Sequence, residues 1–481
     1  MRAEVIGLGE RPVDRRRPAP AVRPRGSLLN DLKALDVWVA LAVLSVIVSA
    51  VCRPSFPVGD PAVFEYIGRA LGDGAHLYTD LWDNKLPSIY LVNALLWHVF
   101  GAHYAMHVFA ESIVNAGSIA LFGAIVRSFG LRRWGPAVLT FSLLYGFVGG
   151  PFDQTEHYAI PLTLAALLLA KKQRPAAAGL LAVIGATFWI PAIAIALPTL
   201  LCLTCSANRF KLLASMCGTA AVCAVLFVAT YGEPTMTELA RSWFSYQAGH
   251  FDRANPQEPH HYPIPWLSPR YYIQSGLGLL LGLIAASWTR RRSPARTFAL
   301  CWSISGIVVV FALGKPSIHY FLAVYAPLVM LLATQPLDLA MLKRRWYFTA
   351  VAGLCALVMV GAAIAEHRTP FFGRPAAIQY TGDLVRRTFG PQAIGVMPWE
   401  IYLASDARPP NRFFLASGSV NFARVRDIWT RAPVVFIDAA DQRFNRLAPP
   451  RDLPLECASP RTAPYVLWSA VPIPGLRCVR T

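Results

Sequence analysis

Residues 59–101 read GDPAVFEYIGRALGDGAHLYTDLWDNKLPSIYLVNALLWHVFG, a stretch crowded with acids and aromatics that ends in an apolar segment. The spacing of its apolar residues predicts a short amphipathic helix over 61–71. The closing segment, 86–101, is apolar enough to enter a bilayer. Whether this segment crosses decides which side of a membrane each later loop occupies, and therefore decides the fold.

The composition indicates that most of the chain lies in a lipid bilayer. Of its 481 residues 55% are hydrophobic and only 15% are charged, which is unlike an ordinary soluble domain. Lys and Arg together number 45, against 27 for Asp and Glu. Such a basic excess arises either from contact with nucleic acid or from cytoplasmic loops that follow the positive-inside rule.

About eleven segments are apolar enough to cross a bilayer, which takes about 20 residues and somewhat fewer inside a helical bundle. These candidate spans are residues 35–52, 104–126, 135–149, 157–170, 176–189, 190–205, 212–231, 271–288, 297–313, 319–335 and 346–365.

The basic residues settle how segment 86–101 is placed. They gather in RSFGLRRW from Arg127, KKQR from Lys171, NRFK from Asn208, TRRRSPAR from Thr289 and LKRR from Leu342. If 86–101 does not cross, all of these lie on the side of the basic N-terminal tail. The positive-inside rule therefore favours a helix at the outer interface. Nucleic-acid binding loses its motivation, because no nucleic-acid module accompanies the charges.

This topology predicts three parts. Residues 1–34, rich in Arg and Pro, predict a disordered cytoplasmic tail and not a removed signal peptide. Residues 35–365 form the membrane domain, with a first outer loop at 53–103 and a third at 232–270. Residues 366–481 alternate apolar runs with Pro- and Gly-rich turns, as a small extracytoplasmic α/β domain would.

Two cysteine pairs invite interpretation. Cys202 and Cys205 form a C-x-x-C without a second pair in an apolar segment, where a free thiol is typically a small hydrophobic side chain, and a metal or redox role is the alternative. Cys457 and Cys478 lie in the predicted outer domain, where a disulfide between them is chemically allowed. The sequence leaves that pairing open.

Asp60 stands immediately after the first predicted span. A carboxylate at this interface is placed to accept a proton from a hydroxyl while a membrane-embedded donor approaches from the side. The alternative is structural, since Asp followed by Pro61 is a common N-cap at the start of a helix. The spacing alone allows both roles.

The stretch resembles the first extracytoplasmic loop of GT-C class membrane glycosyltransferases, particularly the group of protein O-mannosyltransferases and lipid A aminoarabinose transferases. That group has an Asp just after the first helix, a Tyr-containing amphipathic helix, a Y.D.WDNKPP type segment and an apolar helix ending in Phe-Gly. The corresponding residues here are Asp60, Tyr66, Tyr78, Asp80, Trp82, Asp83, Asn84, Lys85, Pro87, Phe100 and Gly101, with Leu86 in place of the first Pro. The likeness covers the N-terminal third, and the rest by topology alone.

The resemblance implies a polytopic α-helical membrane protein of GT-C type with Asp60 as catalytic general base, supported in the first loop by Tyr66 and Asp83. The second outer loop, GGPFDQTEHYAI, resembles the second acidic loop of the family at Asp153 and Glu156. These two acids would bind the acceptor or a metal, or hydrogen-bond the first loop. A hydrated helix start is the alternative.

Transfer from a polyprenyl phosphate leaves a charged phosphate, which cations must stabilise. Lys85 is the first candidate, followed by Arg270 and by Lys315 with His319 in GKPSIHY. The alternatives are snorkelling to lipid headgroups for Arg270 and Lys315, and a helix-start hydrogen bond for His319. Glu111, well inside a span, is more typical of a structural pair.

The donor is expected to be lipid-linked. No Asp-x-Asp motif, which commonly holds the metal of nucleotide-sugar enzymes, occurs in the sequence, and the predicted inner loops are basic. No metal or cofactor is therefore called for. We predict a bacterial inner-membrane glycosyltransferase that moves a hexose or pentose from a polyprenyl-phosphate donor to an envelope acceptor: a lipid, polysaccharide or protein. The alternative is a transporter or flippase of a lipid-linked sugar, although the predicted spans carry few of the ionisable residues that ion-coupled carriers use.

Overall fold

The structure is a computed structural model. It describes residues 56–57, 59–131, 133–147, 154–251, 277–288, 293–312, 318–335, 345–346, 349–350, 353–354, 357, 375–390, 395–396, 399–405, 407, 435–439, 455–462, 465–469 and 471–480. The chain divides into the units Met1–Ala34 and Leu35–Thr481, and all described residues belong to the second. The predicted tail 1–34 and the first predicted span, 35–52, lie outside the described residues.

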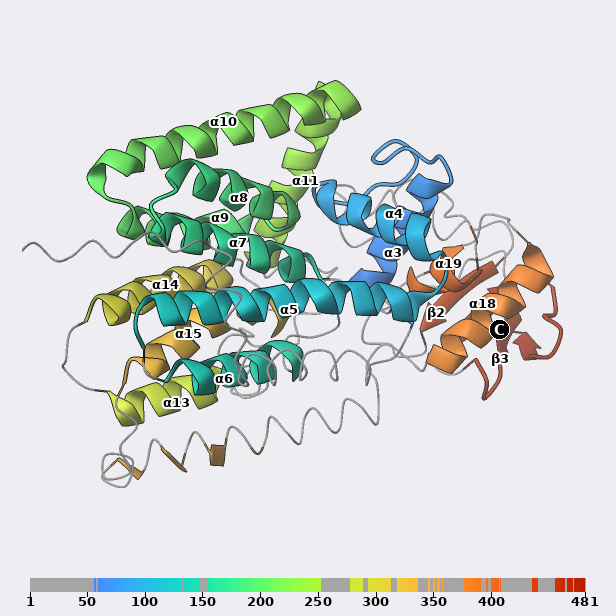
Figure 1. The fold of residues 1–481 in the computed structure, drawn as a ribbon. Coiled ribbons are helices and arrows are strands. Elements are labelled where there is room, and N and C mark those ends of the chain that lie inside the picture. The colour runs from blue at the N-terminus through green and yellow to red at the C-terminus, as the bar shows by residue number, and fades with distance from the viewer. Residues whose placement is uncertain are drawn as a thin grey trace, which may run out of the picture. The chain divides into compact units, whose positions relative to one another are not determined.

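Helices make up most of the described part of the predicted membrane domain (Figure 1). They are α3 (Asp60–Gly72), α4 (Ser88–Phe100), α5 (Tyr104–Ser128), α6 (Trp134–Phe147), α7 (Thr155–Lys171), α8 (Pro175–Phe188), α9 (Pro191–Leu203), α10 (Ser206–Tyr231), α11 (Glu233–Phe251), α13 (Leu277–Ser287), α14 (Pro294–Ala312), the 3-10 helix η2 (Ile318–Phe321) and α15 (Leu322–Ala333). Proline is the first residue of α8, α9 and α14, where its missing N–H costs no hydrogen bond and its fixed φ suits a helix.

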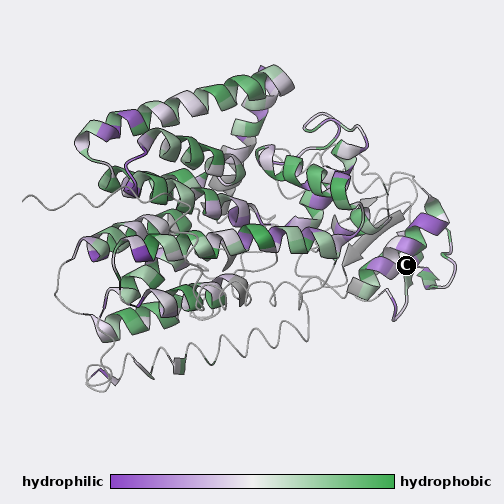
Figure 2. Cartoon of the chain, viewed as in Figure 1, coloured by the Kyte–Doolittle hydropathy of each residue, from purple (hydrophilic) through white to green (hydrophobic). Residues whose placement is uncertain are grey.

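Two helices in the described part of the chain, α5 with 25 residues and α10 with 26, are long and apolar enough to cross a membrane by length and composition. Seven shorter apolar helices of 10–17 residues accompany them. Figure 2 shows hydrophobic residues predominating along α6, α8 and α9. The basic NRFK stretch is not a loop, as its composition suggested, but lies in the first turns of α10. The predicted third outer loop begins with the helix α11.

Helices α3 and α4 form a tight hairpin. The two helices cross closely, because a Cβ added to Gly68 of α3 would lie 2.5 Å from the Cβ of Asn93 on α4. With 13 residues, α4 is about 20 Å long, short of the roughly 30 Å hydrocarbon core of a bilayer. Its side chains Leu91, Leu95 and Val99 form an exposed apolar stripe at helical spacing. An exposed apolar stripe is expected where a helix meets lipid, whereas length alone does not distinguish α4 from α9, which also has 13 residues.

The C-terminal region contains a five-stranded sheet with the order β1-β2-β4-β3-β5. Its strands are β1 (Gly395–Val396), β2 (Val435–Ala439), β3 (Leu455–Ala458), β4 (Tyr465–Ser469) and β5 (Arg477–Arg480). Strand β1 runs parallel to β2, and the other neighbours are antiparallel. Cys457 and Cys478 are partners in the β3–β5 register and form a disulfide, which resolves the pairing that the sequence left open.

Two helices of the C-terminal region, α18 (Pro375–Phe389) and α19 (Trp399–Ser405), pack against each other and α19 packs against α3. One buried cluster contains first-loop residues such as Phe64 and Trp82 together with Val385 of α18 and Tyr402 of α19. The hairpin α3–α4 is therefore held by the C-terminal region as well as by the helices of the predicted membrane domain.

Candidate functional site

The carboxyl group of Asp60 lies at the start of α3. Gly59, with φ of 68°, is the N-cap of this helix, and its carbonyl accepts a hydrogen bond from the Ala62 N–H at 3.0 Å. The structural alternative for Asp60 is therefore wrong by one residue, since Asp60 is the first residue of the helix and not its cap. The side chain of Asp60 is partly buried and accepts no hydrogen bond from any residue that the structure describes. With respect to the described residues, its lone pairs are open to a substrate.

Among the described residues, Asp83 accepts two hydrogen bonds. Its Oδ2 accepts from the Tyr90 hydroxyl at 2.5 Å and its Oδ1 from the Asn84 N–H at 2.6 Å. Asp83 is 5% exposed and Tyr90 is fully buried. Burial raises the pKa of the Tyr90 phenol, and the negative charges of Asp83 and Asp60 add to that rise. Tyr90 therefore stays protonated as a donor, and both carboxylates lie within electrostatic reach of it.

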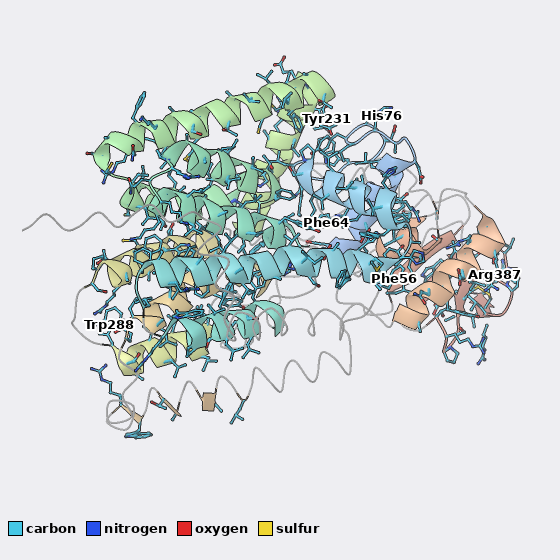
Figure 3. The ribbon with its side chains drawn as sticks, viewed as in Figure 1. Phe56, Phe64, His76, Tyr231, Trp288 and Arg387 are labelled. Atoms are coloured by element: carbon cyan, nitrogen blue, oxygen red, sulfur yellow. A yellow bond between two sulfur atoms is a disulfide. The ribbon has the colours of Figure 1, made fainter. Side chains whose placement is uncertain are left out.

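Lys85 brings a positive charge to this group. Its ammonium nitrogen lies 5.5 Å from the centroid of the Phe64 ring, a cation–π distance. Phe64 follows Asp60 by four residues on α3, so the two side chains share a helix face. The Phe64 ring in turn meets Tyr90 edge to face at 6.0 Å. Figure 3 marks Phe64 on α3. The carboxylate and the ammonium are thus gathered around one pair of aromatic rings.

Side chains of α3 fasten α19 to the first loop. The Tyr66 hydroxyl donates to the Ala407 carbonyl at 3.2 Å, and the Arg69 guanidinium donates to the Leu403 carbonyl at 3.2 Å. From α18, Arg386 donates to the Ala404 carbonyl at 2.6 Å. The Leu403 and Ala404 carbonyls lie in the last turn of α19, where backbone acceptors lack helical partners and positive charge is favourable, and Ala407 follows two residues after the helix ends. The Arg69 contact carries no sequence signal, because its partner is 334 residues away.

A buried acid–base pair links α3 to α5. His107 Nδ1 lies 2.7 Å from Glu65 Oε1, with the two residues 1% and 3% exposed. His107 Nε2 lies 2.9 Å from the Gly101 carbonyl, so Nε2 must carry a proton and donate it. Burial raises the pKa of Glu65, although the hydrogen bond and charge of His107 oppose the rise. The pair leaves no periodic pattern in the sequence and was not predicted from it.

The second acidic position is enclosed. Glu156 lies in the first turn of α7, is 1% exposed and accepts a hydrogen bond from the Thr155 hydroxyl at 3.2 Å. Nearby on the same helix, the Tyr158 hydroxyl donates to Oε1 of Glu111 on α5 at 2.9 Å. Glu111, buried at 3% exposure, therefore has a structural partner of the kind expected. Asp153 lies outside the described residues.

The remaining predicted cations are not described. Arg270 and Lys315 lie outside the described residues, and His319 belongs to η2 without a described side chain. Within the described ranges, no group of three or more His, Cys, Asp or Glu side chains is arranged to hold a metal ion. The candidate site that the described residues assemble therefore consists of Asp60, Asp83, Lys85, Phe64 and Tyr90.

Comparison with solved structures identifies the fold. No family model and no curated protein matches the sequence. The structure is similar to ArnT from Cupriavidus metallidurans bound to undecaprenyl phosphate, with a TM-score of 0.52 and 13% identity over 90% of this chain and 97% of that chain. The apo state of the same ArnT gives a TM-score of 0.50 and 15% identity over the same shares. The chain therefore has the helical GT-C-type fold of membrane glycosyltransferases, as the first-loop resemblance implied.

Proposed function

We propose that this protein is a glycosyltransferase that moves a sugar from a polyprenyl-phosphate donor to a hydroxyl of an envelope acceptor, with Asp60 as the general base. The observation that carries the proposal is the partly buried Asp60 carboxylate, which has no hydrogen-bond partner among the described residues and shares a helix face with the ring that holds the Lys85 ammonium. The binding of undecaprenyl phosphate by ArnT, a protein of the same fold, supports the class of donor.

The reaction is a single displacement at the anomeric carbon. Asp60 takes the proton of the acceptor hydroxyl as the acceptor oxygen forms a bond to the anomeric carbon. The bond from this carbon to the phosphate oxygen breaks, and its electron pair leaves with the polyprenyl phosphate. The configuration of the sugar is inverted. Lys85, which lies over the Phe64 ring, stabilises the charge that develops on the leaving phosphate.

The other predicted residues take places around this centre. Asp83 holds the Tyr90 phenol, and Tyr66 holds α19, so both support the first loop. Arg270, Lys315 and His319 are proposed as further contacts of the donor phosphate, and Asp153 with Glu156 as a second acidic site toward the acceptor. We place the first loop and residues 366–481 on the extracytoplasmic side of a bacterial inner membrane, and residues 1–34 in the cytoplasm.

The proposal is tested by replacing Asp60 with Asn, which keeps the size of the side chain and removes its basicity. Transfer by the purified protein in detergent with a polyprenyl-phosphate sugar should fall about 10²- to 10⁴-fold. Asp73→Asn is the matched control, because Asp73 is an exposed acid just after α3 and should leave the rate unchanged. Equal rates for the Asp60→Asn variant and the unsubstituted protein would contradict the role of Asp60.

The sugar and the acceptor are to be identified by comparing extracted glycolipids and envelope glycans from cells with and without the protein. A sugar that is present in cells with the unsubstituted protein, and missing both from cells without it and from cells with the Asp60→Asn variant, would identify the product. Identical glycan profiles in all cells would contradict glycosyl transfer and leave transport of a lipid-linked sugar as the stronger interpretation.

A further inference from the structure

Tyr78 has an unusual backbone conformation. Its φ is 67°, in the left-handed region that bulky residues rarely adopt. Its side chain is nevertheless only 1% exposed, so this conformation is held by the surrounding structure. Backbone strain of this kind persists where contacts over-determine a residue, and it concentrates at functional sites. The contacts of Tyr78 therefore indicate the role of this backbone conformation.

The polar groups of Tyr78 close the loop that ends at Lys85. Its N–H donates to the Leu81 carbonyl at 2.7 Å, and its phenol donates to the Lys85 carbonyl at 2.6 Å. Burial, followed by the charge of Asp83, raises the pKa of this phenol well above its ordinary value. The hydroxyl therefore stays protonated at neutral pH and remains a donor. The main chain at Lys85 is held by this bond.

The ring of Tyr78 joins the same loop to α10. It meets the Tyr231 ring at a centroid distance of 5.2 Å and an interplanar angle of 87°, and the Phe227 ring at 5.7 Å. Figure 3 marks Tyr231 at the end of α10. Gly232, with φ of 84°, follows Tyr231 as the C-cap and allows the chain to turn directly into α11. Tyr78 thus touches both the Lys85 loop and the helix end that opens the third outer loop.

We infer that Tyr78 is a positioning residue for donor binding: it fixes the main chain of Lys85 against the end of α10, so that the ammonium group is held where the phosphate of a polyprenyl phosphate binds. This inference rests on the proposed function. The hydrogen bond from Tyr78 to the Lys85 carbonyl affects the group that binds the donor phosphate. It does not contact Asp60 at the start of α3. Loss of this hydrogen bond should therefore weaken donor binding more than it slows the chemical step.

The test replaces Tyr78 with Phe, which keeps the ring contacts and removes the bond to the Lys85 carbonyl. Loss of one buried hydrogen bond should weaken binding of undecaprenyl phosphate to the purified protein about tenfold. The KM for the sugar donor should rise by about the same factor, with kcat changed less than about threefold. Binding is measured by titration in detergent and the kinetic constants by initial rates of transfer.

Tyr325→Phe is the matched control. Tyr325 is a fully buried tyrosine of α15 whose hydroxyl has no hydrogen-bond partner in the described part of the chain, so removing the hydroxyl should change neither binding nor kinetics. If Tyr78→Phe lowers the melting temperature too far for measurement, Tyr231→Leu replaces it. That variant removes the ring contact from the side of α10, and should weaken binding in the same direction by a smaller factor.

The outcomes separate this inference from the proposed function. Undecaprenyl phosphate binding that is equal for the Tyr78→Phe variant and the unsubstituted protein would overturn the positioning role while leaving the proposed function intact. A fall in kcat with unchanged donor KM would also overturn it. If the unsubstituted protein itself binds no undecaprenyl phosphate, the proposed donor is wrong and the inference falls with it.

Discussion

The starts of α3 and α7 both carry an acid that the sequence singled out, but the structure surrounds the two acids differently. Asp60 is partly buried, has no hydrogen-bond partner within the described ranges, and shares a helix face with the ring under Lys85. Glu156 is 1% exposed and accepts a hydrogen bond from Thr155. A carboxylate that can take a proton from an incoming hydroxyl must be reachable, so the comparison favours Asp60 as the base and a supporting role for Glu156.

The comparison extends to how each helix is held. Helix α3 is fixed to α5 by the buried Glu65–His107 pair and to α19 by Tyr66 and Arg69. Helix α7 is likewise fixed to α5, by the hydrogen bond from the Tyr158 hydroxyl to Glu111. A reachable carboxylate keeps a fixed position only if the rest of its helix is anchored. The anchors of α3 are therefore as much a part of the site as Asp60 is.

The largest expected effect is a loss of stability when the buried Glu65–His107 pair, which holds α3 to α5, is broken. His107→Leu leaves the carboxyl group of Glu65 buried without its partner, which should lower the free energy of unfolding by about 3–5 kcal/mol. Glu65→Gln should cost less, because its amide can donate to His107 Nδ1 and cannot ionise. Thermal unfolding in detergent measures both variants. A His107→Leu variant as stable as the unsubstituted protein would show that α3 is held by other contacts.

The same pair predicts a pH dependence with a definite sign. Burial raises the pKa of Glu65 above its ordinary value of 4.5. The folded state therefore favours the protonated form of Glu65. Its contribution to the free energy of unfolding is fully present below the pKa that Glu65 has in the unfolded chain, and it is lost as pH rises through the pKa that Glu65 has in the folded protein. The Glu65→Gln variant lacks this loss, so its melting temperature relative to the unsubstituted protein should increase as pH rises. A difference that is constant with pH, or that falls, would contradict the raised pKa.

The next effect tests the cation that distinguishes the two acids. Lys85→Met removes the ammonium group and should lower kcat/KM for transfer about 10²- to 10³-fold. Lys85→Arg should retain part of the activity because it keeps the charge. Lys211→Met is the control, since Lys211 is an exposed lysine near the start of α10. Full activity of the Lys85→Met variant would contradict a role for Lys85 in stabilising the leaving phosphate.

The smallest effect is expected at Glu156. Glu156→Gln keeps an oxygen that can accept the hydrogen bond from Thr155, so transfer should fall less than about tenfold, which corresponds to about 1.4 kcal/mol. Initial rates compared with those of Asp60→Asn measure the contrast directly. If both variants lose activity to the same degree, the two acids act in the same step and the distinction between a reachable and an enclosed acid fails.

Periodic features of the structure were predictable from the sequence. The helix expected at 61–71 is α3, Asp60–Gly72, and the segment expected at 86–101 contains α4, Ser88–Phe100. Both follow from apolar spacing and from proline at helix starts, which are local signals. Hydropathy did not find α11 or the first turns of α10, because it detects apolar length, whereas Ser, Arg and Lys also fit a helix.

The site was predictable only in part. Asp60, Asp83 and Lys85 stand in one motif; in the structure Asp83 contacts Tyr90, Lys85 lies over Phe64, and the charge of Asp60 acts on Tyr90. The contacts that hold them join residues far apart in the chain and leave no pattern in a single sequence. His107 lies 42 residues from Glu65, and Leu403 lies 334 residues from Arg69. The left-handed conformation of Tyr78 is likewise set by its packing and not by its residue type.

The central claim is that Asp60 acts on the outer face of the membrane, opposite the basic loops, and labelling of introduced cysteines tests it most directly. Asp73→Cys places a thiol in the exposed turn after α3, and Ser293→Cys places one at an exposed position just before α14. A membrane-impermeant maleimide is added to intact cells, with the unsubstituted protein as background. If Asp60 lies on the outer face, position 73 is labelled in intact cells and position 293 only after the membrane is opened. Labelling of position 293 but not position 73 in intact cells would contradict the outer location of Asp60.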